Sequence, residues 1–265
     1  MKKALWAVCV IWLLGLPVLA QDMNDLDLLL DAYVTEDDPA VVVFIDYAGE
    51  TWRSARGLAD YENEIPAEMD DLFRIASVTK PFVATLILQL VEAGEIDLDA
   101  PIADYLPDEI VNRVDNADSA TVRQMLQMTS GIVDYTGTDG FNDAVEDNLR
   151  YAWSAEETIE FIYDEPADFP AGTDYEYSNS NYNLAQIIIE AVTGESLADV
   201  LDTQIFEPLG MAGCYLETPD VFGQHTVRGY EVEFGEWLEV TDVNDGVGLG
   251  DGGIVCPAED LAKFP

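Results

Sequence analysis

The sequence is poor in histidine, and this shortage narrows the chemistry that the protein can perform. His225 is the single histidine, in an irregular polar stretch where a surface position is expected, and no H-E-x-x-H motif or Cys/His cluster occurs. A catalytic zinc site is therefore not expected. A G-x-S-x-G motif, which carries the nucleophile of α/β-hydrolases, is also missing. We expect chemistry that uses no metal and no other cofactor.

Basic residues are scarce as well. The chain has 53 acidic and 11 basic residues and a formal net charge of -42. Nucleic acid is excluded as a partner because phosphate neutralisation needs clustered lysine and arginine, and an anionic membrane surface would repel the chain. The acidity indicates a solvated surface suited to a salty environment. The alternative is calcium binding, but no D-x-D-x-D-G loop with a trailing glutamate supports it.

The N-terminal segment has the pattern of a signal peptide. Lys2 and Lys3 precede an apolar run over residues 4–16, and Pro17 and Ala20 provide a plausible cleavage end over residues 1–20. Cleavage predicts export to the periplasm or the extracellular space, with no stable membrane span left in the remaining domain, residues 21–265. The alternative is an uncleaved membrane anchor, since the apolar run approaches the length of a short span.

Two cysteines lie beyond this segment, and their state is open. An oxidising compartment permits a disulfide between Cys214 and Cys256. Cysteine is also a common small buried residue, and two cysteines follow no spacing rule that would require a bond.

Apolar spacing and turn residues divide most of the chain into short elements. Residues 25–33 predict a helix, and the β-branched run 40–47 with residues 51–57 predicts a hairpin. Residues 82–93 are apolar on nearly every side, which is typical of a buried core helix. Further helices are expected over residues 121–131, 154–163, 183–192 and 197–205.

The remaining stretches lack strong periodicity. Residues 132–150 are polar and aromatic and predict a surface excursion, whereas residues 213–245 predict short strands and loops. A glycine run over residues 246–253 precedes a helix start at Pro257. Such a run can bind phosphate, but Asp251 in its middle favours a packing loop.

A serine and a lysine stand three residues apart where the core helix begins. Ser77 and Lys80 would share one face of the helix. A serine beside a lysine is a known activated nucleophile that needs no histidine. The alternative is a capping serine near a salt-bridging lysine. A lysine at the foot of a buried helix is costly without partners or a task, which favours the catalytic pair.

Tyr177 and Asn179 are candidates for the other groups of such a site. A lysine ammonium stabilises a neighbouring phenolate, so Tyr177 could take the proton of Ser77. The amide of Asn179 offers a donor and an acceptor that could orient Lys80 or a substrate amide. A Y-x-N triplet alone is common in turns, and its value depends on the S-x-x-K pair about a hundred residues earlier.

Several short motifs occur together and in order. They are Phe73 with Ser77-Val78-Thr79-Lys80, Gly94-Glu95-Ile96-Asp97-Leu98, Met128-Thr129-Ser130-Gly131, Pro170-Ala171-Gly172 with Tyr177-Ser178-Asn179, and Gly252-Gly253 with Ala258-Glu259-Asp260-Leu261. Over residues 38–265 the chain resembles the serine β-lactamase-related family, which includes class C β-lactamases, D-Ala-D-Ala carboxypeptidases and esterases.

The resemblance implies a fold and a role for each candidate. The fold would be a mixed α/β one, an antiparallel sheet flanked by helices plus a mostly helical lobe, with the site between them. Ser77 would be the acylated nucleophile, Lys80 its partner, Tyr177 the general base, and Asn179 a substrate-contacting residue.

One family motif, a K-T-G or H-x-G strand, has no counterpart before Pro265. We therefore expect a domain over residues 21–265 that is incomplete at its C-terminus, with the hairpin short of neighbouring strands. Two hypotheses follow. The first is an exported serine hydrolase that cleaves an amide, lactam or ester of a small molecule or peptide. The second is an inactive fragment or penicillin-binding-like module. The sequence does not choose among β-lactam, D-Ala-D-Ala peptide and ester substrates.

Overall fold

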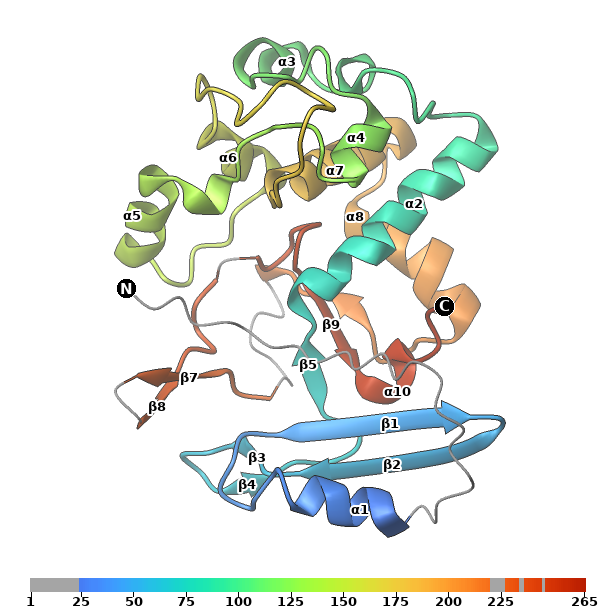
Figure 1. Cartoon of the computed structure of the whole chain (residues 1–265), viewed down its shortest axis with the longest axis vertical. Helices are drawn as coiled ribbons and strands as arrows, with labels where there is room; N and C mark the ends of the chain where they lie inside the picture. The colour runs from blue at the N-terminus through green and yellow to red at the C-terminus, as the bar shows by residue number, and fades with distance from the viewer. Residues whose placement is uncertain (1–23, 220–226, 234–235, 245) are drawn as a thin grey trace.

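Helices gather at one end of the molecule and strands at the other (Figure 1). The computed structural model describes residues 24–219, 227–233, 236–244 and 246–265. The predicted signal peptide, residues 1–20, and His225 lie outside the described residues. Within the described residues the strands form four small antiparallel sheets, with the orders β1-β2, β3-β4, β5-β9-β6 and β7-β8.

The strand-rich end is built on the predicted hairpin. Helix α1 (Asn24–Asp31) contacts β2 (Glu50–Arg56), which pairs along its full length with β1 (Val41–Tyr47). Both residues of the connecting turn have positive φ, 55° at Ala48 and 85° at Gly49, as a two-residue turn of type I′ requires. Residues 41–45 of β1 are half-buried, whereas Tyr47 is exposed. Strands β3 (Leu58–Asp60) and β4 (Ile65–Pro66) form a smaller pair beside this hairpin.

A three-stranded sheet brings together segments that are far apart in the sequence. Strand β9 (Ile254–Pro257) lies between β5 (Leu72–Arg74) and β6 (Tyr215–Leu216). Strand β5 leads through a 3₁₀ turn, η1 (Ala76–Val78), into α2 (Thr79–Ala93). A separate hairpin of β7 (Tyr230–Glu233) and β8 (Glu236–Glu239) lies to one side of the sheet (Figure 1). The short sheet therefore positions the N-terminus of α2.

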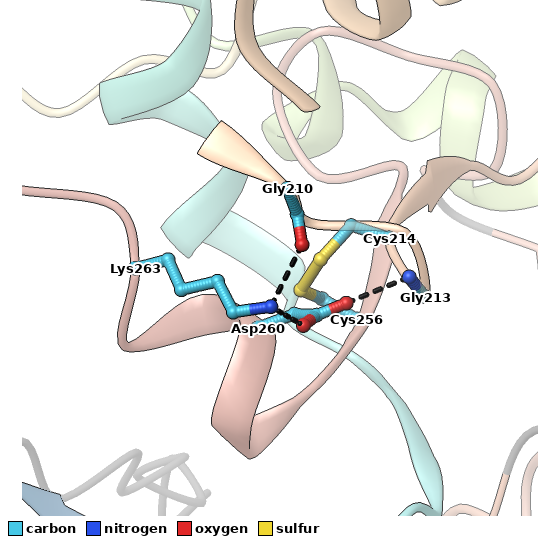
Figure 2. The surroundings of a disulfide bond; sticks show 6 residues. All are labelled: Gly210, Gly213, Cys214, Cys256, Asp260 and Lys263. Atoms are coloured by element: carbon cyan, nitrogen blue, oxygen red, sulfur yellow. Dashed lines mark hydrogen bonds and ion pairs between the residues drawn. A yellow bond between two sulfur atoms is a disulfide. The ribbon is translucent and has the colours of Figure 1, made fainter. Parts of the chain in front are cut away.

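The two cysteines left open by the sequence are bonded across this sheet. Tyr215 pairs with Val255 in the β6–β9 ladder, and Cys214 lies opposite Cys256 at the next position, with their Cα atoms 4.1 Å apart. Figure 2 shows the disulfide beside Asp260, which accepts hydrogen bonds from the Gly213 amide (2.7 Å) and from Lys263 (2.6 Å). The disulfide and these bonds tie α10 (Ala258–Leu261) to the chain that precedes β6.

The helical end is organised around α7 (Ser180–Thr193), of which residues 180–189 are all buried. This helix contacts α2, α4 and α6. The surrounding elements are the helices α3 (Asp108–Arg113), α4 (Val122–Leu126), α5 (Asp139–Asp147), α6 (Ala155–Glu160), α8 (Leu197–Leu201) and α9 (Glu207–Leu209), the π-helical turn η4 (Asp202–Phe206), and the 3₁₀ turns η2 (Ile102–Asp104) and η3 (Tyr135–Gly137).

Residues 132–141 contribute to the core, so the prediction of a surface excursion is wrong for this part, whereas residues 146–150 are exposed as predicted. Ile132, Tyr135 and Phe141 are at most 3% exposed. The ring centre of Phe141 lies 4.8 Å from that of Tyr135. The ring centres of Trp153 and Phe161 lie 5.6 and 5.4 Å from that of Phe141. The segment has no apolar period because it packs through a few large rings rather than along one face of a helix.

Helix α2 is buried on one side, whereas the sequence predicts burial nearly all round. Phe82, Val83, Leu86 and Ile87 are enclosed, but Leu88 is 49% exposed. By length and composition the helical stretch Ala76–Ala93 could cross a membrane, a criterion that core helices of water-soluble proteins also meet.

Candidate active site

Ser77 lies in a tight connection between sheet and helix. Strand β9 holds both sides of it, because the Ile75 amide donates to the Ile254 carbonyl (3.0 Å) and the Ile254 amide donates to the Thr79 hydroxyl (3.1 Å). Ala76 has a positive φ of 47°, a conformation that costs free energy in a residue other than glycine. Ser77 itself is exposed. The connection thus presents the exposed Ser77 between two points that are hydrogen-bonded to β9.

Lys80 is 5% exposed, yet its ammonium group is fully hydrogen-bonded. Its Nζ donates to Ser77 Oγ (3.0 Å), Asn179 Oδ1 (2.8 Å) and the Asp251 carbonyl (2.6 Å). An ammonium group has three donors, so these three acceptors satisfy a buried charge that would otherwise be costly. The predicted Ser77–Lys80 contact is therefore present in the structure.

Tyr177 approaches Ser77 from the other side. The two hydroxyl oxygens are 2.8 Å apart, and Lys80 Nζ lies 5.0 Å from the centre of the Tyr177 ring. Tyr177 is 41% exposed, so it can face a substrate as well as the serine. The Ser77 hydroxyl thus has a cation on one side and a phenol on the other, an arrangement that can move a proton.

A second tyrosine near Lys80 is a poorer base. Tyr182 has its ring centre 5.8 Å from Lys80 Nζ, and its hydroxyl donates to the Leu126 carbonyl (3.2 Å). Burial raises the pKa of Tyr182, and the neighbouring Tyr177 adds to this rise. Tyr182 therefore remains a protonated packing residue.

Asn179 has both ends of its side-chain amide occupied by protein groups. The oxygen accepts from Lys80, and the nitrogen donates to Asp134 Oδ2 (3.1 Å) and Thr136 Oγ1 (3.4 Å). Asn179 is also the residue that precedes α7. Of the two roles that the sequence leaves open, this geometry favours orienting Lys80 over binding a substrate amide.

Two residues of this arrangement, Asp251 and Asp134, could not be recognised as site residues from the sequence. Asp251 contributes its carbonyl from the glycine-rich loop, and Asp134 comes from the segment predicted to lie at the surface. The loop does pack tightly, because a Cβ atom on Gly253 would lie 2.8 Å from the amide nitrogens of Gly248 and Leu249. The predicted packing of the glycine-rich loop is present, but its hydrogen bond with Lys80 was not predicted.

The M-T-S-G motif supports the site without contributing to it directly. Gly131 has a φ of +72°, and a Cβ atom there would clash with the Phe169 carbonyl, so only glycine fits. The hydroxyl of Ser130 is buried and donates to Asn181 Oδ1 (2.6 Å). Ser130 is thus a packing residue and not a second nucleophile.

Comparison with known proteins identifies the family of this chain. The sequence model of the Beta-lactamase family matches residues 26–265. The chain belongs to the Beta-lactamase family. The resemblance inferred from the ordered motifs is thereby confirmed, and so is the mixed fold of helices and antiparallel sheets, which solved Beta-lactamase relatives share.

Among curated Beta-lactamase relatives, esterase EstB of Burkholderia gladioli is 33% identical over 184 residues, which cover 66% of this chain and 46% of the esterase. Penicillin-binding protein 4 of Amycolatopsis lactamdurans is 34% identical over 173 residues, which cover 65% of this chain and 42% of that protein. The chain therefore spans less than half the length of these relatives.

Solved structures in this family superpose over most of the chain. A D-stereospecific amidohydrolase from Streptomyces sp. has a TM-score of 0.77 and 26% identity, with 92% of this chain and 72% of that chain covered. A D-amino acid amidase from Ochrobactrum anthropi SV3 has a TM-score of 0.75 and 30% identity, with 92% and 69% covered.

Proposed function

We propose that the protein is an exported serine hydrolase that forms an acyl-enzyme on Ser77 and releases the acyl group to water. One observation carries this proposal: the exposed Ser77 hydroxyl lies within hydrogen-bond distance of both Lys80 Nζ and Tyr177 Oη. Membership of the Beta-lactamase family supports the same chemistry.

In the proposed mechanism, Tyr177 acts as a phenolate and accepts the Ser77 proton while Oγ attacks the carbonyl carbon of the substrate. The Lys80 ammonium group stabilises the phenolate by its charge and orients Oγ by its hydrogen bond. Tyr177 then gives the proton to the departing amine or alcohol, which leaves an ester on Ser77. A water molecule attacks this ester, Tyr177 takes its proton, and the proton returns to Oγ.

The proposed substrates are amides, lactams or esters of small molecules or peptides. The names of the relatives support this range, since one is an esterase and another a D-amino acid amidase. The resemblance to a penicillin-binding protein supports a second possibility, a module that is acylated but deacylates slowly. The hydrolase and the slowly deacylating module differ only in how fast water removes the acyl group from Ser77.

Export is proposed from the signal-peptide pattern of residues 1–20. The Cys214–Cys256 disulfide supports it, because such bonds persist in oxidising compartments. The intact mass of protein recovered from the periplasm or the medium should lack about the first 20 residues. Recovery of the uncleaved chain in the cytoplasm alone would contradict export.

The activity is tested on the full chain with a chromogenic cephalosporin, a p-nitrophenyl ester and a D-amino acid amide. We expect Ser77→Ala to lower turnover of the accepted substrate by at least about 1,000-fold. The control is Ser178→Ala, because Ser178 Oγ is buried with no hydrogen-bond partner among the described residues. Full activity of Ser77→Ala would rule out the proposed nucleophile, and a burst without turnover would indicate the slowly deacylating module.

A further inference from the structure

Two consecutive residues, Asp134 and Tyr135, contact the two acceptors of Lys80 other than Ser77. Asp134 accepts hydrogen bonds from the Asn179 amide side chain (3.1 Å) and from the Asn179 backbone N–H (3.2 Å). The Tyr135 hydroxyl donates to Asp251 Oδ2 (2.9 Å). Asn179 and Asp251 in turn supply the oxygens that accept from Lys80 Nζ.

We propose that Asp134 and Tyr135 are positioning residues that aim the Lys80 ammonium group at Ser77 by fixing its other two acceptors. The inference rests on the proposed function, because it assigns these residues a task in the same acylation step. Neither residue contacts Ser77 or Lys80 in the described hydrogen bonds.

Asp134 determines which end of the Asn179 amide faces Lys80. An ionised carboxylate only accepts hydrogen bonds, so the amide nitrogen turns toward Asp134 and the amide oxygen turns toward Lys80. The carboxylate is held in turn by Thr136, whose hydroxyl donates to Oδ2 (3.0 Å) and whose N–H donates to Oδ1 (3.2 Å). Without the carboxylate, a flipped Asn179 would present donors to the ammonium group, and Lys80 would lose an acceptor.

Tyr135 plays the corresponding part for Asp251. Its side chain is fully buried, and its amide donates to the Ser180 hydroxyl (2.9 Å), which donates to the Val133 carbonyl (2.8 Å). Ser180 is the first residue of α7 and is also buried. The Tyr135 backbone is thus fixed to the helix that follows Asn179, and its hydroxyl fixes Asp251, which is 5% exposed.

The two acceptors of Lys80 other than Ser77 are therefore both fixed by one dipeptide, Asp134-Tyr135. With two of its N–H groups fixed, the ammonium group directs the third at Ser77 Oγ. A small displacement of a catalytic group can cost about 100-fold in rate. Loss of either positioning contact should therefore slow the chemical step, while substrate binding at the exposed side of the site is retained.

The test compares Asp134→Asn and Tyr135→Phe with wild type in the full chain, using kcat, KM and the labelling rate of Ser77 by a fluorophosphonate. We expect kcat and labelling to fall about 10- to 100-fold, with KM changed less than about threefold. Asp60→Asn is the matched control. Its carboxylate caps a local turn in the same way, by accepting from the Asn63 N–H (3.0 Å) and side chain (2.8 Å), but it lies in β3, outside the site. Asp60→Asn should leave kcat and the labelling rate of Ser77 within about twofold of wild type.

The final extent of labelling separates positioning from folding. A variant that fails to fold does not reach one adduct per chain, whereas a displaced Lys80 slows labelling and leaves its final extent unchanged. We expect Asp134→Asn and Tyr135→Phe to reach one adduct per chain at the lower rate. Wild-type kcat in both variants, or a reduced extent of labelling at the wild-type rate, would overturn the inference.

The outcome for Ser77→Ala keeps the two proposals apart. If that variant is inactive and unlabelled while Asp134→Asn and Tyr135→Phe match wild type, only the positioning inference fails. If Ser77→Ala is as active and as readily labelled as wild type, the proposed function fails and the positioning inference fails with it.

Discussion

At the scale of single residues, two buried charges are satisfied in different ways. The Lys80 ammonium group is surrounded by neutral oxygen acceptors, whereas the Glu217 carboxylate, 1% exposed, is paired with Arg74. Arg74 Nε and Nη2 donate to the two Glu217 oxygens (2.7 and 3.1 Å), and Nη1 donates to the Thr241 carbonyl (2.7 Å). The first arrangement leaves Lys80 available to Ser77, and the second links β5 to the loop that follows β8.

Replacing Arg74 with methionine should destabilise the protein strongly. The substitution removes the charge and both hydrogen bonds that Arg74 supplies to the buried Glu217 carboxylate. Breaking a buried ion pair from one side typically costs about 3–5 kcal/mol in the free energy of unfolding. Urea unfolding measures this change. Arg123→Met is the control, since its partner Asp99 is exposed, and the unfolding midpoint should hardly move. An equal loss in both variants would contradict the assignment of Arg74–Glu217 as a structural buried pair.

Tyr230 should make stability depend on pH in the alkaline range. Burial raises the pKa of Tyr230 to about 12, and the hydrogen bond that its hydroxyl donates to Glu62 (2.7 Å) adds to the rise. The folded state therefore holds a proton that the unfolded state, with a tyrosine pKa of about 10, releases. The stabilisation of the folded state by protonated Tyr230 is complete below about pH 10 and is lost as the pH rises toward about 12.

Urea midpoints of wild type and Tyr230→Phe, measured at pH 8 and pH 11, test this dependence. The wild-type midpoint should fall more steeply with pH than that of the variant. Tyr33→Phe, at a side chain that is 79% exposed, should behave as wild type. Parallel pH profiles for wild type and Tyr230→Phe would contradict the expected linkage.

At the scale of elements, the disulfide holds together the sheet from which α2 begins. It joins residues 42 apart in sequence and bonds Cys214, the residue before β6, to Cys256 in β9 (Figure 2). Closing a loop of this length typically stabilises a protein by about 2–4 kcal/mol, chiefly by restricting the unfolded chain. The free energy of unfolding of Cys214→Ala/Cys256→Ala should be lower by that amount, and reducing agent should lower only the wild-type value. Identical stability with and without reductant would contradict the bond.

The elements that the sequence predicts well are those whose signals are local. Helices α2 and α7 both end at a glycine in the left-handed conformation, Gly94 and Gly194. The helix expected from residue 154 begins with a capping box, in which the side chains of Ser154 and Glu157 each accept a backbone N–H of the other residue. The Ser77–Lys80 contact is likewise local, since it needs only one turn of helix.

Contacts between distant segments are what the sequence does not reveal. Tyr135 and Asp251 are 116 residues apart, and neither belongs to a periodic pattern. The core position of residues 132–141 escapes sequence reasoning for the same reason, because a few aromatic rings account for the burial of this segment. The placement of Tyr177 and Asn179 beside Ser77 could be expected only from the ordered family motifs.

At the scale of the whole molecule, the dominant property is a net charge of -42. The ion pairs of the described residues are few and mostly exposed, so they cannot offset this excess. Repulsion among the carboxylates opposes the compact state and weakens as salt shortens the Debye length from about 30 Å at 0.01 M to about 3 Å at 1 M.

The thermal midpoint should therefore rise with salt. We expect a clear increase between 0.01 M and 1 M sodium chloride, with most of it at the lower concentrations, where screening changes most in absolute distance. Potassium chloride at the same ionic strength should give the same increase, because screening depends on ionic strength rather than on the cation. A midpoint that is flat or falls with sodium chloride would contradict an acidic surface under self-repulsion.

Activation of Ser77 as a nucleophile by Lys80 and Tyr177 is the claim on which the proposed function depends. Its most direct test is the covalent adduct formed with a fluorophosphonate, located by peptide mass mapping and followed over time. We expect one adduct per chain, on Ser77, and a labelling rate about 100-fold or more lower in Tyr177→Phe. An adduct on another serine, no adduct, or an unchanged rate in Tyr177→Phe would contradict the claim.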